Sequence, residues 1–265
     1  MTTPSSTVHP AAIRASDLTL GYAGEPVVDG IDLDVEPGEI LVVLGHSGCG
    51  KSTLLRAIAG LVRPIDGDLL ANGRTVEGTS GDRTLVFQED ALLPWRSARR
   101  NVELALEVQG VGRAERRRRA AEWLDRVGLS RFADRLPGQL SGGMRQRVQL
   151  ARALATGPGV ICMDEPFGAL DAQTRASMQR LLVEAWQASG CTVVFVTHDV
   201  DEALVLGDRI VVLGRHGIVS EHRIDQPRDP ARPPGPDVRA EVLAHLATTQ
   251  SLAPIPDAPS ERSVA

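Results

Sequence analysis

Runs of alternating and continuous apolar residues divide this chain into short strands and helices. Residues 13–35 alternate and break at Gly21, Gly24 and Gly30, which predicts short antiparallel strands. We expect further strands at residues 39–44, 83–88, 160–163 and 191–197, and hairpins at 68–76 and 209–223. We expect helices at residues 51–61, within 97–135, and at 142–156, 171–189, 201–206 and 237–246. Strands that alternate with helices predict an α/β fold with a parallel sheet.

The same pattern suggests three segments. Residues 1–12 are polar and are predicted to be a flexible N-terminus, and residues 13–224 form one domain with a helical subdomain at about 89–156. From residue 225 the chain turns proline-rich, and we expect a C-terminal extension over 225–265 whose last residues, 251–265, are disordered.

Composition excludes several classes of protein. The chain has 265 residues and a net charge of -5, so its overall charge does not indicate binding to nucleic acid. No stretch approaches 18 uninterrupted apolar residues, and residues 1–10 lack the apolar core of a secretory signal. Three scattered cysteines have no metal-ligand spacing, which predicts a reducing, cytosolic location.

A glycine-rich loop follows the apolar run 39–44 and precedes the predicted helix 51–61. It fits G-x-x-x-x-G-K-[ST], a pattern whose backbone N–H groups cradle phosphate at a helix N-terminus. Lys51 is the only lysine among 29 basic residues, which indicates a pocket that a broad guanidinium does not fit. The alternative is a plain glycine-rich turn. The candidate ATP-binding residues here are Gly45, His46, Ser47, Gly48, Cys49, Gly50, Lys51, Ser52 and Thr53.

Two carboxylates end the apolar run 160–163. Asp164 is a candidate to hold Mg²⁺ together with Ser52, and Glu165 is a candidate general base that polarises the attacking water. A solvated turn with incidental acids is the alternative, which the preceding phosphate loop and the following Pro166 disfavour.

The segment Leu140-Ser141-Gly142-Gly143-Met144-Arg145-Gln146 resembles the signature motif of ABC ATPases. Ser141 can cap the following helix, and Gly142 and Gly143 open its N-terminus to an anion. The resemblance implies a P-loop NTPase of ABC type, with a RecA-like parallel-sheet core, an antiparallel β-subdomain and a helical signature subdomain. It also implies that the signature grips the γ-phosphate of ATP in the opposite subunit, so that the active form is a head-to-tail dimer of this chain or of this chain and a paralogue.

Four further residues match the family by position. Tyr22 matches the aromatic residue that stacks on adenine, although it is equally a candidate packed strand residue. Gln88 matches the glutamine that senses Mg²⁺ and the attacking water, and Asp171 matches the loop that crosses the dimer interface. His198 matches the histidine that contacts the γ-phosphate. The resemblance covers residues 13–223, and every expected motif is present.

The segment Phe87 to Trp95 is similar to the nitrate, sulfonate and taurine importer group. The resemblance implies a separate integral-membrane permease that docks near Gln88 to Trp95, a solute-binding protein, and a peripheral location on the cytoplasmic face of the membrane. Trp95 suits a docking surface, but a place in the core of the helical subdomain is the alternative. The cationic run Arg113 to Arg119 is best explained as a solvated helix face, with contact to anionic lipid or permease as the alternative.

Three rival functions are weaker. A soluble ABC ATPase of translation or DNA repair usually carries tandem domains or a long coiled coil, and neither is present. A small-molecule P-loop kinase has no use for the signature, for Gln88 or for His198. An exporter motor is often fused to its membrane domain. The sequence therefore predicts the ATP-hydrolysing subunit of an importer, with Mg²⁺ and ATP as its ligands.

Overall fold

The computed structural model describes residues 10–89, 91–214, 217–224, 228 and 235–249. Most of the predicted flexible N-terminus and the predicted disordered tail at 251–265 lie outside these residues. The domain boundaries at residues 13, 89, 156 and 225 remain predictions. The observed helices and strands are given below.

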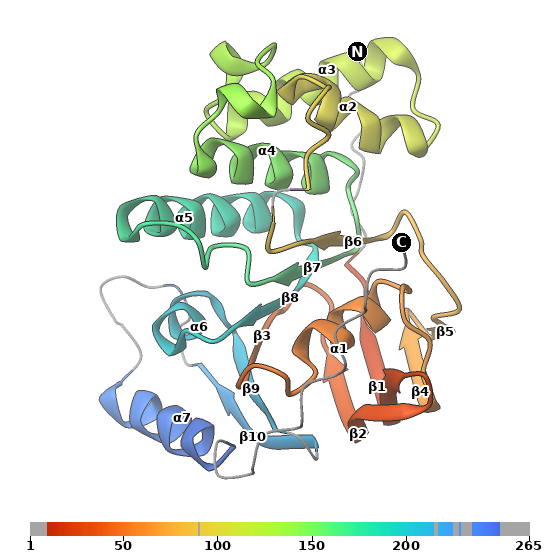
Figure 1. The fold of residues 1–265 in the computed structure, drawn as a ribbon, viewed down its shortest axis with the longest axis vertical. Coiled ribbons are helices and arrows are strands. Elements are labelled where there is room, and N and C mark those ends of the chain that lie inside the picture. Colours follow the sequence, from red (N-terminus) through yellow and green to blue (C-terminus); the bar gives the residue numbers. More distant parts are fainter. Residues whose placement is uncertain (1–9, 90, 215–216, 225–227, 229–234, 250–265) are drawn as a thin grey trace, which may run out of the picture.

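A six-stranded sheet of order β10-β9-β3-β8-β7-β6 forms the centre of the molecule (Figure 1). Strands β6 to β9 and β3 are parallel, and β10 pairs antiparallel with β9 at the edge. Every residue of β3 and β8 is buried, as expected for parallel strands covered on both faces. The strands are β3 (Ile40–Leu44), β6 (Arg83–Val86), β7 (Val160–Asp164), β8 (Thr192–Thr197), β9 (Arg209–Gly214) and β10 (Gly217–Arg223).

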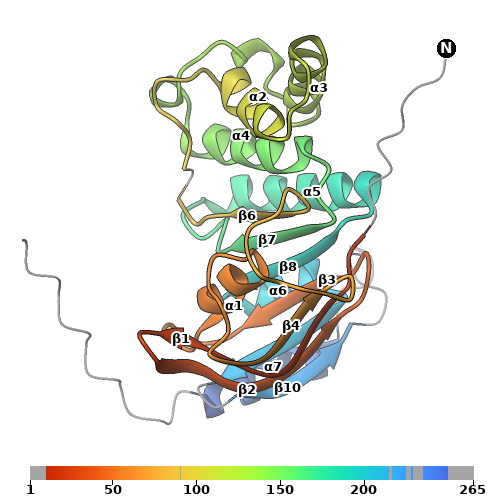
Figure 2. The same cartoon turned by 90° about the vertical axis from the view of Figure 1, so that its right-hand side faces the viewer.

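An antiparallel sheet of order β2-β1-β4-β5 covers helix α1, which lies between the two sheets (Figure 2). The turn between β4 and β5 has positive φ at both Asn72 (51°) and Gly73 (71°), the conformation that a tight two-residue hairpin requires. The elements of this layer are β1 (Ile13–Tyr22), β2 (Glu25–Val35), β4 (Asp66–Ala71), β5 (Arg74–Thr75) and α1 (Lys51–Ile58).

The helical subdomain lies at one end of the molecule and has its own apolar core (Figure 1). Its helices end before glycines with positive φ, Gly110 after α2 and Gly128 after α3. The predicted helical stretch 97–135 therefore breaks where the glycines indicated, but its last part forms only a 3₁₀ turn, Ser130–Phe132. The helices are α2 (Ala98–Val108), α3 (Arg113–Arg126) and α4 (Gly142–Ala155), and a second 3₁₀ turn is Pro137–Gln139.

Three helices cover the remaining face of the central sheet. They are α5 (Ala172–Ser189), α6 (Val200–Leu206) and α7 (Pro236–Thr248). Helix α7 belongs to the proline-rich extension, yet Val242 is fully buried in the same apolar cluster as the central strands. This part of the extension therefore packs on the central sheet.

Arg209 at the start of β9 joins the two sheets. Its Nε lies 2.7 Å from Glu39 Oε1 and its Nη1 lies 3.0 Å from Glu221 Oε1, and its Nη2 also donates to the backbone carbonyl of Asp34. The Arg209 and Glu39 side chains are only 7% and 9% exposed. Removing one partner of such a pair leaves a buried charge without compensation.

We expect Arg209→Ala to lower the free energy of unfolding by about 3–5 kcal/mol, measured by urea denaturation. The control is Arg14→Ala, which removes a pair with Asp34 whose side chains are 66% and 61% exposed, and which we expect to leave the urea midpoint unchanged. Equal effects of the two variants would contradict the assigned role of burial.

Candidate active site

The loop between β3 and α1 is shaped by glycines that other residues could not replace. Gly48 and Gly50 have φ values of 82° and 98°, in the left-handed region. A Cβ on Gly50 would lie 2.2 Å from Val28 Cγ2, and one on Gly45 would lie 2.6 Å from Cys49 Sγ. Helix α1 begins without a side-chain cap and without an acidic residue in its first turn. Its N-terminus therefore keeps the partial positive charge that favours an anion.

Lys51 lies inside this loop and is only 6% exposed. Its Nζ donates to two backbone carbonyls, that of Gly45 at 2.8 Å and that of His46 at 2.9 Å. Both partners are neutral carbonyl groups, so neither of these two contacts balances the positive charge of the ammonium group. A phosphate at the mouth of the loop would supply the missing negative charge.

The loop forms one wall of a cavity of about 600 Å³. The carboxyl ends of β7 and β8, Val27 of β2 and the segment after β6 complete the wall. The lining residues are Val27, His46, Ser47, Gly48, Gly50, Lys51, Ser52, Thr53, Gln88, Asp164, Glu165 and His198. The fold thus gathers most of the predicted ATP, metal and catalytic residues at the carboxyl ends of the parallel strands, where open α/β sheets bind ligands.

Asp164 and Ser52 face each other across the cavity wall. The Ser52 hydroxyl donates to Asp164 Oδ1 at 3.0 Å. Burial raises the pKa of Asp164, while the Ser52 hydrogen bond opposes that effect. A cation beside this partly desolvated carboxylate would therefore stabilise its ionised form.

This donor set fits Mg²⁺. A hydroxyl, a carboxylate and the nearby Gln88 amide offer the oxygen ligands that Mg²⁺ prefers, and phosphates of a nucleotide can complete the shell. Among the described residues there is no cluster of three or more His, Cys, Asp and Glu side chains that could hold a metal by themselves. The arrangement therefore suits a metal that arrives with a nucleotide.

Glu165 stands next to Asp164 in a strained backbone conformation. Its φ is 42°, and its N–H donates to the carbonyl of Val196 at 3.0 Å. The two consecutive carboxylates have different partners. Glu165 Oε2 accepts a hydrogen bond from His198 Nδ1 at 3.0 Å, whereas Asp164 accepts one from Ser52. Left-handed φ at a residue other than glycine costs of order 1–3 kcal/mol and is concentrated at functional sites.

The backbone around Gln88 is held by two glutamines of α4 that the sequence analysis did not single out. Gln149 is 1% exposed and its Nε2 donates to the carbonyls of Phe87 and Glu89, both at 3.1 Å. Gln146 Nε2 donates to the Gln88 carbonyl at 3.3 Å. The signal in the sequence was two amides three residues apart, which share one helix face.

Seven predicted residues do not line the cavity, and two of them, Gly45 and Cys49, are buried within the phosphate loop itself. Tyr22 is 47% exposed and its hydroxyl accepts from Arg56 Nη1 at 3.2 Å. The other four lie at the N-termini of α4 and α5, where Ser141 and Asp171 cap the helices through Met144 N–H and Thr174 N–H. A Cβ on Gly143 would lie 2.7 Å from Thr174 Cγ2, so the signature and the Asp171 loop are neighbours. The seven are Tyr22, Gly45, Cys49, Ser141, Gly142, Gly143 and Asp171.

A glycine loop with a buried lysine after one parallel strand, and paired carboxylates at the end of another, define a P-loop nucleotide-hydrolysing enzyme. Comparison with known proteins identifies the family. The ABC transporter family model matches residues 28–168. The chain therefore belongs to the ABC transporter ATP-binding family, and it is an ATPase, as the sequence predicted.

Named relatives match most of the chain. The taurine import ATP-binding protein of Chromobacterium violaceum is 49% identical over 77% of this chain and 78% of its own. The aliphatic sulfonates import ATP-binding protein of Streptomyces avermitilis is 44% identical over 91% of this chain and 89% of its own. An uncharacterised ABC transporter ATP-binding protein of Methanocaldococcus jannaschii is 49% identical over 76% and 77%.

Solved structures confirm the predicted ABC-type P-loop fold. A dimeric ATP-binding cassette in a post-hydrolysis state, bound to ADP and Pi, has a TM-score of 0.72 and 35% identity, and it covers 80% of this chain and 98% of its own. A component of an ABC transporter complex from Clostridium perfringens has a TM-score of 0.75 and 25% identity, with 88% and 90% covered. No helix in the part of the chain that the structure describes is long and apolar enough to cross a membrane.

Proposed function

We propose that this ATPase is the motor subunit of an importer for taurine, an aliphatic sulfonate or a related small solute, such as nitrate. The observation that carries the proposal is similarity along most of the chain to relatives named for taurine and sulfonate import, at 44–50% identity. The motor works as a dimer beneath a separate permease. A solute-binding protein delivers the solute to that permease. Its place is peripheral, on the cytoplasmic face of the membrane.

The phosphate loop binds ATP. The backbone N–H groups of residues 45–53 surround the phosphates, and Lys51 exchanges its carbonyl partners for β- and γ-phosphate oxygens. Ser52 and Asp164 would hold Mg²⁺, with Gln88 nearby, and the ion would supply positive charge against the phosphates. Tyr22 supplies an aromatic face for adenine, and its exposed position beside α1 suits a flat ligand.

Hydrolysis depends on Glu165 and His198. A carboxylate only accepts hydrogen bonds, so His198 donates from Nδ1 and presents Nε2 to the cavity. This bond orients Glu165 to take a proton from the attacking water, while His198 contacts the γ-phosphate. Gln88 is held by the α4 glutamines at the cavity edge, from which it can orient the same water.

A second subunit completes the site. The signature residues Ser141, Gly142 and Gly143 form the exposed N-terminus of α4, outside the cavity of their own chain. In a head-to-tail dimer each signature covers the γ-phosphate held by the partner subunit, and Asp171 lies at the contact. ATP therefore closes the dimer and its loss opens it, which moves the docked permease.

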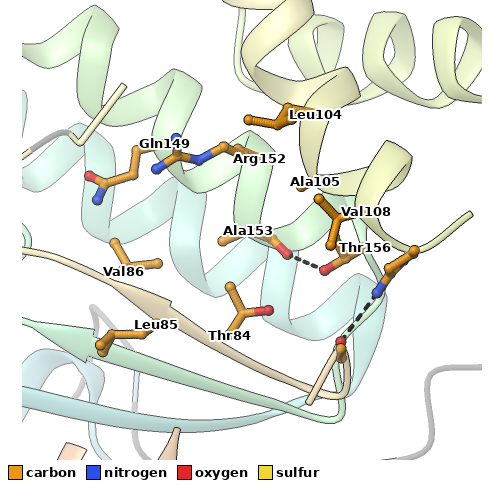
Figure 3. A pocket seen from close by; sticks show the side chains of 12 residues that line it. Thr84, Leu85, Val86, Leu104, Ala105, Val108, Gln149, Arg152, Ala153 and Thr156 are labelled. Atoms are coloured by element: carbon orange, nitrogen blue, oxygen red, sulfur yellow. Dashed lines mark hydrogen bonds between the residues drawn. The ribbon is translucent and has the colours of Figure 1, made fainter. Parts of the chain in front are cut away.

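The permease contact is proposed at the junction of the helical subdomain and the central sheet. Trp95 is 72% exposed, so the alternative that it fills the subdomain core is wrong. A separate hollow of about 330 Å³ lies between Val108, the last residue of α2, which is 81% exposed, and Leu85 of β6 (Figure 3). An exposed tryptophan before the start of α2 and an apolar hollow near its end are two features that suit a helix of a membrane partner.

Affinity isolation of the chain from detergent-solubilised native membranes tests the proposal. We expect mass spectrometry to find a multi-spanning permease and a solute-binding protein, and ligand screening of the latter to name the solute. Ribosomal or DNA-repair proteins without a permease would overturn the transport function and leave the ATPase standing.

Trp95→Ser tests the docking surface in the same experiment. We expect it to reduce recovery of the permease about 30-fold, the equivalent of roughly 2 kcal/mol for a central tryptophan, with the ATPase rate of the isolated subunit within twofold of wild type. Val219→Ser, at an exposed position of β10, is the matched control and should recover the permease fully. Normal recovery with Trp95→Ser would place the docking surface elsewhere.

A further inference from the structure

The C-terminal helix α7 touches the phosphate loop. His46, in the loop, places its Nε2 2.9 Å from the carbonyl oxygen of Leu246 in the last turn of α7. A carbonyl only accepts, so His46 is the donor and carries its proton on Nε2. The two residues are 200 positions apart in the sequence, and this contact joins the proline-rich extension to the nucleotide site.

Helix α7 is fastened to the core by contacts along its length. Val242 is fully buried against the central sheet, and Arg239 Nε lies 2.7 Å from Asp201 Oδ1 of α6. His245 Nδ1 lies 3.2 Å from His222 Nε2 of β10. Between β10 and α7, Arg228 pairs with Asp208 and lies over the Trp186 ring at 4.3 Å. The position of the Leu246 carbonyl is therefore set by the core and not by the extension alone.

His46 connects α7 to Lys51 through two hydrogen bonds. Its side chain is held by α7, and its own backbone carbonyl accepts from Lys51 Nζ at 2.9 Å. The loop turns through two glycines with positive φ, and such a backbone is conformationally free unless contacts hold it. The bond to Leu246 therefore restrains the loop from a helix that is distant in the sequence.

We propose that α7 is a positioning element of the nucleotide site and that the His46 side chain is its positioning residue, which holds the phosphate loop in the conformation that receives phosphate. The inference rests on the proposed role of the loop in ATP binding. It assigns a function to the C-terminal extension, which lies outside residues 28–168 matched by the family model. Preorganisation of this kind acts on affinity, because a loose loop must be ordered when the nucleotide binds.

The test compares variants on both sides of the contact, in the full chain. His46→Ala removes the donor, His46→Gln keeps an N–H that can reach the carbonyl, and Val242→Asp detaches α7. Leu243→Ala, at an exposed position next to Val242, is the matched control. The readouts are the Kd for the fluorescent nucleotide mant-ADP, kcat and KM for ATP, and the Tm without nucleotide.

We expect His46→Ala and Val242→Asp each to raise Kd and KM about fivefold, with kcat within twofold of wild type. The double variant should be no weaker than the weaker single variant, because both changes remove one contact. Leu243→Ala should bind as wild type does, and His46→Gln should recover most of the affinity that His46→Ala loses, because it restores the N–H donor. If Val242→Asp does not fold, Val242→Ala takes its place, with a smaller rise in the same direction.

A lower Tm with unchanged Kd in the α7 variants would make the helix merely structural and overturn the inference. Effects that multiply in the double variant would also overturn it, since they would show that His46 and α7 act separately. Failure of the wild-type chain to bind mant-ADP would instead refute the proposed nucleotide site.

Discussion

Glu165→Gln is expected to bind ATP as tightly as wild type, to lose about 10²–10⁴-fold in hydrolysis, and to form a stable dimer with ATP. The substitution keeps the side-chain shape and the hydrogen bond from His198 to an oxygen, but it removes the base that takes the proton of water. ATP then stays intact, and the closed dimer cannot open by losing the γ-phosphate. Steady-state phosphate release, equilibrium nucleotide binding and gel filtration with and without ATP measure the three outcomes.

Glu184→Gln is the control, because it removes a similar charge from an exposed position of α5. It should hydrolyse ATP at the wild-type rate and dimerise no more than wild type does. Normal ATP hydrolysis by the Glu165→Gln protein would contradict the assignment of Glu165 as the general base. The strained backbone at this residue would then need another explanation.

Lys51→Ala is expected to weaken ATP binding, turnover or both by two or more orders of magnitude. A charge-assisted contact in a desolvated site contributes several kcal/mol once its partner is left unpaired, and each 1.4 kcal/mol is tenfold. We expect Lys51→Arg to lose nucleotide binding or turnover as well. Lys51 is only 6% exposed, and the carbonyls of Gly45 and His46 lie close around its Nζ. This space fits a slim ammonium group but not a planar guanidinium. Nucleotide titration and kcat/KM report both variants.

Arg63→Ala removes an exposed cation shortly after α1 and serves as the control. It should leave nucleotide binding within twofold of wild type. Normal hydrolysis by Lys51→Ala would refute the phosphate-loop assignment, whereas normal hydrolysis by Lys51→Arg alone would refute only the argument from pocket size.

These two residues separate the two halves of the reaction. In the proposed mechanism, Lys51 binds phosphate before the chemical step, and Glu165 acts only when water attacks. The His46 variants fall on the binding side, so the inferred role of α7 predicts a small version of the Lys51 effect and none of the Glu165 effect. A change in kcat alone with His46→Ala would therefore contradict that role.

The sequence by itself determined the elements and the chemical identity of the site. The predicted function of residues 45–53 rests on local spacing, since a phosphate loop needs only a strand, a few glycines and a helix start in succession. Asp164 and Glu165 end a buried run, and Gly110 and Gly128 end helices, each for reasons that lie within a few residues. Such signals are readable because the groups that interact are neighbours along the chain.

Only the tertiary structure decided which distant groups meet. The bond of Gln149 to Phe87 and Glu89, the pair Arg209–Glu39 and the contact of His46 with Leu246 join residues 60 to 200 positions apart. No local pattern marks such partners, because a glutamine, an arginine or a backbone carbonyl has the same propensity whatever it meets after folding. The same holds for the separation of the signature from its own cavity. That separation follows from the position of the helical subdomain at the far end of the sheet, and it is why a second subunit is proposed to complete the site.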